Sequence, residues 1–303
     1  MKPIPTIHAP TTPILAPPAR EAAPGVDEAV SEFLAVVTRA IDAGTADLPP
    51  MSPIAAQAAR LRKSAEPLEP LLLRIVESEP AVAGQVLRLA STAYFGQAGG
   101  AAASLRTACG QIGARTIVNL VETAARSDFL RLGKDGTSHI LRKIWTNTLY
   151  TACAARELAR WGGEVDPDEA FVAGMFHRVG EVLIVRYFSE QATADGGATQ
   201  EGLLQAIVDD HQAAVGERLL RSWGLPESIC AVAGGHADGT TLAAIVCAAW
   251  QSALHYGYAY LAARPDPAAL REALKAIRLD PSDFEDIPET IGPALNAALS
   301  MSR

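Results

Sequence analysis

A histidine and an arginine, His177 and Arg178, stand next to each other in the largely apolar stretch FVAGMFHRVGEVLI at residues 171–184. The stretch is predicted to form a buried helix. Histidine can bind a metal or transfer a proton, whereas arginine is always positively charged and cannot be a metal ligand. A positive charge about 4 Å from a divalent cation is repelled by roughly several kcal/mol inside a protein. The pair therefore favours binding over metal-dependent catalysis, unless His177 is simply a core residue whose ring nitrogens are both hydrogen-bonded.

The sequence contains no motif that is typical of an enzyme with a nucleophilic residue or a phosphate-binding loop. There is no G-x-S-x-G motif and no glycine-rich loop of the P-loop or dinucleotide-binding type. The cysteines lie in apolar segments, where a reduced cysteine packs as a small hydrophobic residue. We therefore predict no cofactor and no catalytic residue. The four cysteines, none of them in a CxxC spacing, are Cys109, Cys153, Cys230 and Cys247.

The composition favours a cytoplasmic protein. The chain has 303 residues, of which 49% are hydrophobic and 20% are charged, and its net charge is -8. Nucleic-acid binding needs clustered lysine and arginine, so an acidic chain argues against a nucleic-acid partner. No run of about 18 apolar residues could span a membrane, and the N-terminal segment lacks the apolar centre of a secretory signal. We expect neither nucleic acid nor membrane as a partner.

The chain is predicted to be all-α, because apolar residues recur at helical spacing and no segment alternates as a strand would. Residues 1–25 are rich in proline and are expected to form a flexible arm. Residues 26–47 are expected to form an N-terminal helix, residues 48–240 the main domain and residues 241–303 a C-terminal helical extension.

The helix that carries His177 is predicted to run without a break from Asp168 to Phe188. Asp168 follows Pro167 and stands where an N-cap is expected. Further helices are predicted at residues 26–41, 71–76, 81–93, 105–112, 116–129, 140–161, 201–223, 226–234, 242–256, 268–277 and 289–301.

Four segments together resemble the HDOD family, the bacterial HD-related output domain, over residues 48–236. The resemblance rests on the order of the four segments, on the Leu-Pro-Pro sequence at residues 48–50 and on Gly235-His236 after the last segment. It implies a multi-helix bundle related to the HD phosphohydrolases and a role in bacterial signalling. The segments are PAVAGQVLRLASTAYFG at residues 80–96, TACGQIG at 107–113, FVAGMFHRVG at 171–180 and HQAAVGERLLRSWGLP at 211–226.

The resemblance also identifies the positions at which an HD enzyme binds its metals. Its early histidine would fall at Asn147, its His-Asp pair at His177 and Arg178, and its later histidines at His211 and His236. Its final aspartate would fall near the AAW sequence at residues 248–250, so both expected carboxylates are absent. The five matching residues are therefore candidates for a vestigial pocket or a ligand-binding site rather than for a metal site. Arg178 could anchor a phosphorylated ligand, because its planar guanidinium can donate two parallel hydrogen bonds.

Three functions stay open at this stage. The chain could be a non-catalytic scaffold that binds a signalling protein in trans, since it has no room for a second catalytic module. It could sense a phosphorylated small molecule or a nucleotide. As the alternative, it could be a metal-dependent phosphohydrolase of nucleotides or cyclic dinucleotides, in which His177, His211 and His236 would bind zinc. Exposed helix faces would also allow a homodimer.

Overall fold

The structure, a computed structural model, consists of helices joined by turns and loops in the part of the chain that it describes, and that part contains no strand. This confirms the prediction of an all-α fold. The arm predicted at residues 1–25 lies outside the described residues. The described residues are 26–49, 61, 68–92, 102–126, 137–191, 197–235, 239–261 and 263–300.

Most of the predicted helices are present, with ends that differ by a few residues. In chain order they are α1 (Val26–Asp42), α3 (Leu68–Ser78), α4 (Pro80–Ala90), α5 (Leu105–Ile112), α6 (Ala114–Arg126), α7 (Thr137–Gly162), α8 (Pro167–Phe176), α9 (Val179–Gln191), α10 (Gly197–Ser222), α11 (Glu227–Gly234), α12 (Thr241–His255), α13 (Pro267–Ala276), α14 (Pro281–Glu285) and α15 (Ile287–Ser300).

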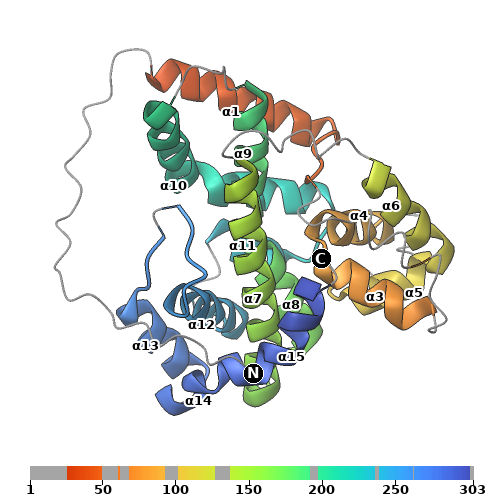
Figure 1. Cartoon of the computed structure of the whole chain (residues 1–303), viewed down its shortest axis with the longest axis vertical. Helices are drawn as coiled ribbons and strands as arrows, with labels where there is room; N and C mark the ends of the chain where they lie inside the picture. Colours follow the sequence, from red (N-terminus) through yellow and green to blue (C-terminus); the bar gives the residue numbers. More distant parts are fainter. Residues whose placement is uncertain are drawn as a thin grey trace.

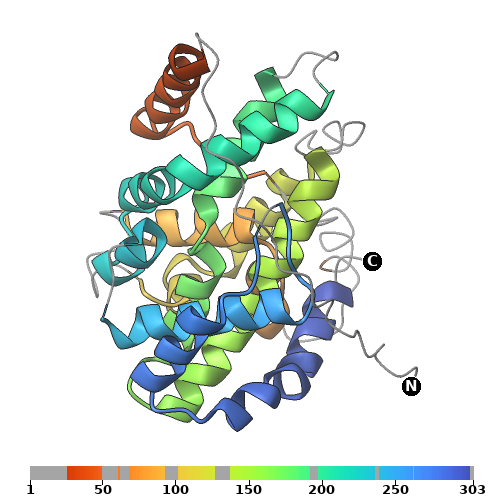
Figure 2. The ribbon, with the colours of Figure 1, turned by 90° about the vertical axis from the view of Figure 1, so that its left-hand side faces the viewer.

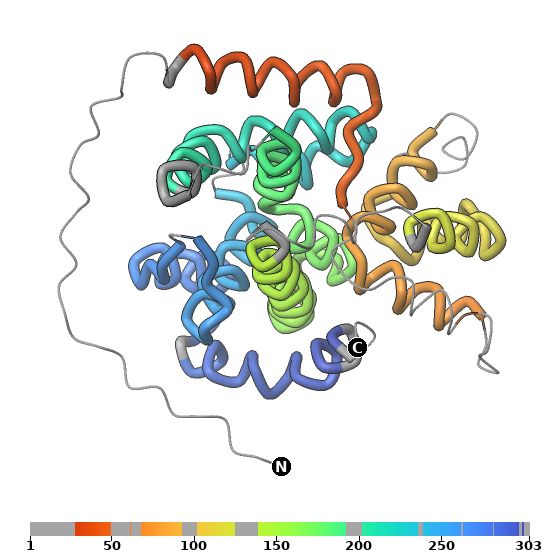
Figure 3. Tube along the Cα trace, turned by 45° about the horizontal axis from the view of Figure 1, so that its top comes forward, coloured from red at the N-terminus to blue at the C-terminus, as the bar shows by residue number. Residues whose placement is uncertain are grey.

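Helix α7 runs through the middle of the molecule, and the other helices surround it (Figures 1 and 3). Helices α8, α12 and α15 pack directly on α7. Helices α3 to α6 form a group on one side (Figure 1). Helix α1 lies on α9 and α10 at one end, whereas α13 to α15 lie at the opposite end (Figures 1 and 2). The site around His177 is therefore built on a central, well-supported part of the fold.

A single hydrophobic core connects these helices. It contains buried residues from α1 at the start of the described chain to α15 at its end, such as Val37, Leu149 and Ile287, each 0% exposed. None of the helices in the described part of the chain is long and apolar enough to cross a membrane.

The prediction of one unbroken helix across residues 168–188 is wrong, because the structure has two helices there. Helix α8 ends at Phe176, with His177 as its C-cap, and α9 begins at Val179. His177 and Arg178 form the turn between them. The two residues that the sequence places inside a helix thus lie at a junction, where their side chains can reach different neighbours.

The position of this break matches the close contact of α9 with α10. A Cβ atom added at Gly180 would lie 1.9 Å from the carbonyl oxygen of Gln212 and 2.7 Å from the backbone nitrogen of Gly216. Only glycine, which has no side chain, permits such an approach of two helix backbones. The local apolar pattern predicts a continuous helix. The close packing of α9 on α10, from a distant part of the chain, lies directly after the break.

The predicted N-cap of the same helix is also wrong. The cap is Asp166, whose side chain accepts a hydrogen bond of 2.8 Å from the backbone nitrogen of Asp168. Pro167 occupies the first turn, where its missing N–H is not needed. The helix therefore starts one residue earlier than expected, and the Asp168 side chain is available for another role.

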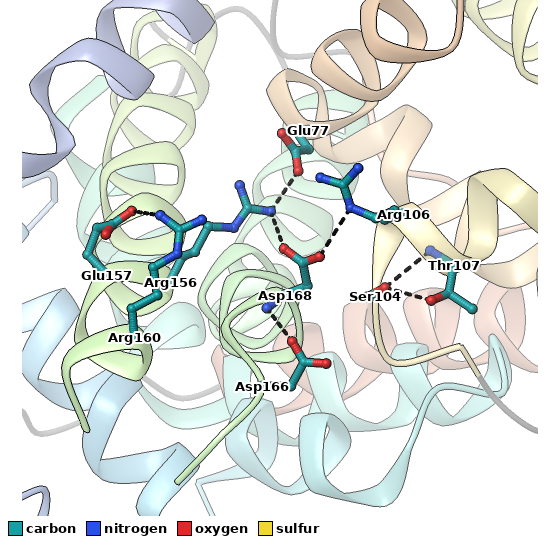
Figure 4. A network of polar contacts seen from close by, with 9 residues as sticks. All are labelled: Glu77, Ser104, Arg106, Thr107, Arg156, Glu157, Arg160, Asp166 and Asp168. Carbon is teal, nitrogen blue, oxygen red and sulfur yellow. Dashed lines mark hydrogen bonds and ion pairs between the residues drawn. The ribbon is translucent and has the colours of Figure 1, made fainter. Parts of the chain in front are cut away.

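Asp168 belongs to an ion-pair network that joins α3 and α5 to the central helices (Figure 4). Its carboxylate lies 3.0 Å from Arg156 of α7 and 3.6 Å from Arg106 of α5. Arg156 also lies 2.6 Å from Glu77 of α3, and its guanidinium stands 3.9 Å from the centre of the Phe171 ring. The network supports the first turn of α8, the helix that ends at His177.

Candidate functional site

His177 is buried, and only one of its two ring nitrogens is hydrogen-bonded within the described residues. His177 is 8% exposed, and its Nδ1 atom lies 2.8 Å from the carbonyl oxygen of Gly174. A carbonyl can only accept, so Nδ1 carries the hydrogen and Nε2 keeps its lone pair. Burial, together with the charge of Arg178, lowers the pKa of His177 to about 3. The ring is therefore neutral near pH 7, and Nε2 is an acceptor without a described partner.

Arg178 is held by a buried carboxylate and an aromatic ring. Its Nε donates to Oε1 of Glu181 at 2.8 Å, and its terminal nitrogen pairs with the same oxygen. Tyr260 donates to the other carboxylate oxygen of Glu181 at 2.5 Å. The guanidinium also stands 4.8 Å from the centre of a Trp250 ring. Burial lowers the pKa of Arg178, but the larger combined effect of Glu181 and Tyr260 holds this pKa above its ordinary value.

Four parts of the chain surround a cavity of about 220 Å³ next to His177. They are the turn between α8 and α9, and helices α10, α11 and α12. The walls are mainly apolar, with polar groups from His177, Arg178, Gln212 and Trp250. The full set of lining residues is His177, Arg178, Gln212, Val232, Ala233, Gly235, Ala243, Val246, Cys247 and Trp250.

The other residues predicted for this site lie elsewhere or outside the described chain. Asn147 of α7 is 0% exposed, and its amide nitrogen donates to the carbonyl oxygen of Tyr258 at 3.0 Å. It does not line the cavity. His211 lines a separate cavity of about 420 Å³ between α10 and α1. His236 lies outside the described residues. Of the five candidates, the structure therefore brings only His177 and Arg178 together at the cavity.

Four residues of the site were missed by the sequence analysis as ligand-site candidates. Gln212 follows His211 in the chain, and consecutive residues of a helix point in directions about 100° apart, so only one of the two can face the cavity. Trp250 belongs to the segment where the final aspartate of an HD site was sought. Glu181 stands three residues after Arg178, a helical spacing that signals an ion pair. Tyr260 gave no local signal.

The residues present do not fit the metal that an HD enzyme binds. His177 offers one imidazole nitrogen, but the adjacent Arg178 carries a positive charge, and Glu181 is already engaged with it. Burial raises the pKa of the Cys247 thiol, so the cysteine at the cavity keeps its proton. No group of three histidine, cysteine or carboxylate side chains in the described part of the chain is arranged to hold a metal.

Solved structures share this fold. The MmoQ response regulator from Methylococcus capsulatus aligns with a TM-score of 0.62 at 22% identity, over 80% of this chain and 97% of that chain. A second crystal structure, of a fragment of MmoQ, aligns with a TM-score of 0.55 at 19% identity, over 78% and 94%. A virulence factor from Campylobacter jejuni aligns with a TM-score of 0.51 at 16% identity, over 90% and 96%. At these identities the likeness establishes the fold alone.

The family comparison is more specific. A search of curated proteins finds no match. The model of the HDOD domain family, however, matches residues 48–238, which includes the turn with His177 and Arg178 and ends before Trp250 of α12. This agrees with the resemblance seen in the sequence, and the chain belongs to the HDOD domain family.

Proposed function

We propose that this protein is a non-catalytic module of bacterial signal transduction. It acts by binding a signalling protein in trans or a small ligand, and it turns over no substrate. The proposal rests mainly on the contacts of Arg178, the residue after His177. Its guanidinium is paired with Glu181 and lies against the ring of Trp250. The position where an HD enzyme needs a metal-binding carboxylate is thus occupied by a guanidinium, and the nearby carboxylate of Glu181 is already paired with it.

The burial of the ion pair makes this arrangement difficult to rearrange. The side chain of Glu181 is 1% exposed and that of Arg178 is 17% exposed. Separating such a pair leaves an uncompensated buried charge, which costs about 3–5 kcal/mol. A metal that needed the Glu181 carboxylate would have to meet this cost as well as the repulsion from Arg178.

The same pairing weighs against Arg178 as the anchor of a phosphorylated ligand. Its charge is already balanced by Glu181, so the cavity offers no net positive charge to an anion. The small ligands expected from the sequence, a phosphorylated molecule or a nucleotide, are therefore less well supported than a ligand without charge. The family relationship and the name of MmoQ as a response regulator support a signalling role in either case.

The metal content of the purified protein tests the proposal. The full chain is purified without chelators and without a metal-affinity column, and its metals are measured by elemental mass spectrometry. We expect less than about a tenth of an equivalent of any transition metal, because one imidazole beside a cation holds metals weakly.

The alternative, a metal-dependent phosphohydrolase, predicts about one or two equivalents that disappear in the variant His177→Ala. That result, together with turnover of a nucleotide or cyclic dinucleotide, would contradict the proposal. As a matched variant, Arg178→Asp restores a carboxylate after His177. We expect it to stay inactive, because Asn147 and the segment around Trp250 still lack carboxylates.

A further inference from the structure

The cavity between the α8–α9 turn and helices α10 to α12 has an apolar wall that is still partly accessible. Helix α12 contributes Ala243, Val246, Cys247 and Trp250 to this wall. Their spacing of three and four residues places them on one face of the helix. Ala243, Cys247 and Trp250 are half-buried, as is Val232 on the facing helix α11. A small molecule that enters the cavity can therefore reach apolar surface on two helices.

Sulfur and aromatic groups complete this wall. Burial raises the pKa of the Cys247 thiol, and a protonated cysteine packs as a small hydrophobic residue. The rings of His177 and Trp250, which both line the cavity, have centroids 6.0 Å apart. Apolar surface is unfavourable in contact with water, so a ligand that covers this wall is stabilised in proportion to the apolar area that it removes from water.

The charges around the cavity favour an uncharged ligand. Arg178 is the one charged residue that lines the cavity in the described part of the chain, and it is paired with Glu181. The ring of His177 is neutral near pH 7. An anion therefore finds no unpaired positive charge, and a cation is repelled by the guanidinium. A neutral molecule needs no opposite charge in the wall.

The volume of the cavity, about 220 Å³, limits the size of the ligand. An apolar cavity of about 150 Å³ accommodates benzene, so this one has room for a benzene ring with a short substituent. Pockets for larger ligands have volumes of about 300–1,000 Å³, and a helix of a partner protein is about 10 Å wide. The cavity therefore suits a small molecule rather than a peptide segment.

We propose that the cavity binds a small, uncharged and apolar molecule, of the size of a benzene ring with a short alkyl group, between α11 and α12. Burial of apolar surface provides the affinity, and the closed shape of the wall selects for size. The inference rests on the proposed function, because it takes the site to bind a ligand without converting it. It replaces the phosphate anchor expected from the sequence with recognition of apolar surface.

Isopropylbenzene and benzoate provide a matched pair of probes, because they have the same number of non-hydrogen atoms and the same branched shape but differ in charge. Each is titrated into the full-length protein while the indole N–H signals of the tryptophans are followed by NMR. A Trp250→Phe variant identifies the signal of Trp250. Trp145, which donates to the carbonyl oxygen of Ser78 at 3.0 Å and does not line the cavity, serves as an internal reference.

We expect isopropylbenzene to move the Trp250 signal in a saturable way and benzoate to leave it in place, while the Trp145 signal stays constant with both. Ala243→Leu should weaken isopropylbenzene binding by about tenfold or more, because the larger side chain overfills the cavity. Ala244→Leu is the control, because the next residue of α12 is also half-buried but does not line the cavity. Val232→Thr keeps the shape of the wall but adds a hydroxyl group, and it should weaken binding by about fivefold.

The proposal is overturned if isopropylbenzene leaves the Trp250 signal unmoved, or if benzoate or inorganic phosphate moves it as strongly. An unchanged affinity in both Ala243→Leu and Val232→Thr would also contradict it. A Trp250 signal that moves when the protein alone is diluted would assign the cavity to a second copy of the chain instead. Failure of the proposed function has a different signature, namely bound metal and turnover in protein that has never been exposed to these probes.

Discussion

His177 uses its two ring nitrogens differently. Nδ1 donates to the carbonyl oxygen of Gly174 at 2.8 Å, whereas Nε2 is buried without a partner among the described residues. Burial penalises the protonated ring, and the neighbouring Arg178 adds electrostatic repulsion. The residue is therefore kept neutral by its surroundings, which is the form in which Nε2 can accept a hydrogen bond.

This environment predicts a pH dependence of stability. The pKa of His177 is lowered from 6.5 to about 3 in the folded protein. In the unfolded chain the ring takes up a proton below pH 6.5, whereas the folded protein resists this until about pH 3. The contribution to stability is thus complete above pH 6.5 and is lost as the pH falls, at about 1.4 kcal/mol per pH unit.

Urea unfolding of the wild type and of His177→Asn between pH 7 and pH 5 measures this contribution. Asparagine can still donate to Gly174 but does not titrate. We expect the free energy of unfolding of the wild type to fall by about 2 kcal/mol more than that of the variant over this range. Parallel pH profiles of the two proteins would show that His177 is not buried in a neutral form.

At the level of the helices, the contact between α9 and α10 determines where the site lies. The backbones approach each other at Gly180, where a Cβ atom would lie 1.9 Å from the carbonyl oxygen of Gln212. The same segment of α10 provides the Gln212 side chain at the cavity. Close packing of these two helices therefore fixes the distance between the α8–α9 turn and one wall of the site.

A methyl group at this contact should be strongly destabilising. In Gly180→Ala the two helices must move apart, and we expect a loss of about 3 kcal/mol in the free energy of unfolding. Gly110→Ala is the control, because Gly110 lies within α5 and its added Cβ would meet nothing within 4 Å. This control should be neutral or more stable by up to about 1 kcal/mol. Equal effects of the two substitutions in chemical denaturation would disprove the close approach.

At the level of the whole molecule, the helices after residue 240 complete both the core and the site. Helix α12 packs on α7, and its residues Ile245, Ala248 and Ala249 are 1%, 0% and 0% exposed. The ring of Trp250, in α12, lies against the guanidinium of Arg178. Tyr260, after α12, donates a hydrogen bond to Glu181. The family match ends at residue 238, so the site extends beyond the matched segment.

A chain that ends at residue 240 should therefore not fold. The truncation exposes the apolar surface of α7 and removes Trp250 and Tyr260, which contact Arg178 and Glu181. We expect this truncated chain to show no cooperative thermal transition by circular dichroism. A chain that ends at residue 264 keeps α12 and Tyr260, and it should melt cooperatively at a lower temperature than the full chain. A cooperative transition of the shorter chain would support residue 240 as the end of an independent domain.

The sequence by itself determined the helical class, the family and the adjacency of His177 and Arg178, because helical periodicity and the order of motifs are properties of the linear chain. It could not determine that His211 faces a different cavity from Gln212, since this depends on how α10 is rotated against its neighbours. Nor could it predict that Tyr260 bonds to Glu181, 79 residues away.

The break between α8 and α9 is another feature that the sequence could not determine. Local apolarity predicts one helix there, but the backbone contact at Gly180 becomes favourable only when α10 is in place. Burial, pairing of charges and the shape of the cavity all arise from contacts between distant segments. For this reason the sequence shows only that an arginine stands at the position matched to the aspartate of an HD site, and the tertiary structure decides what that arginine contacts.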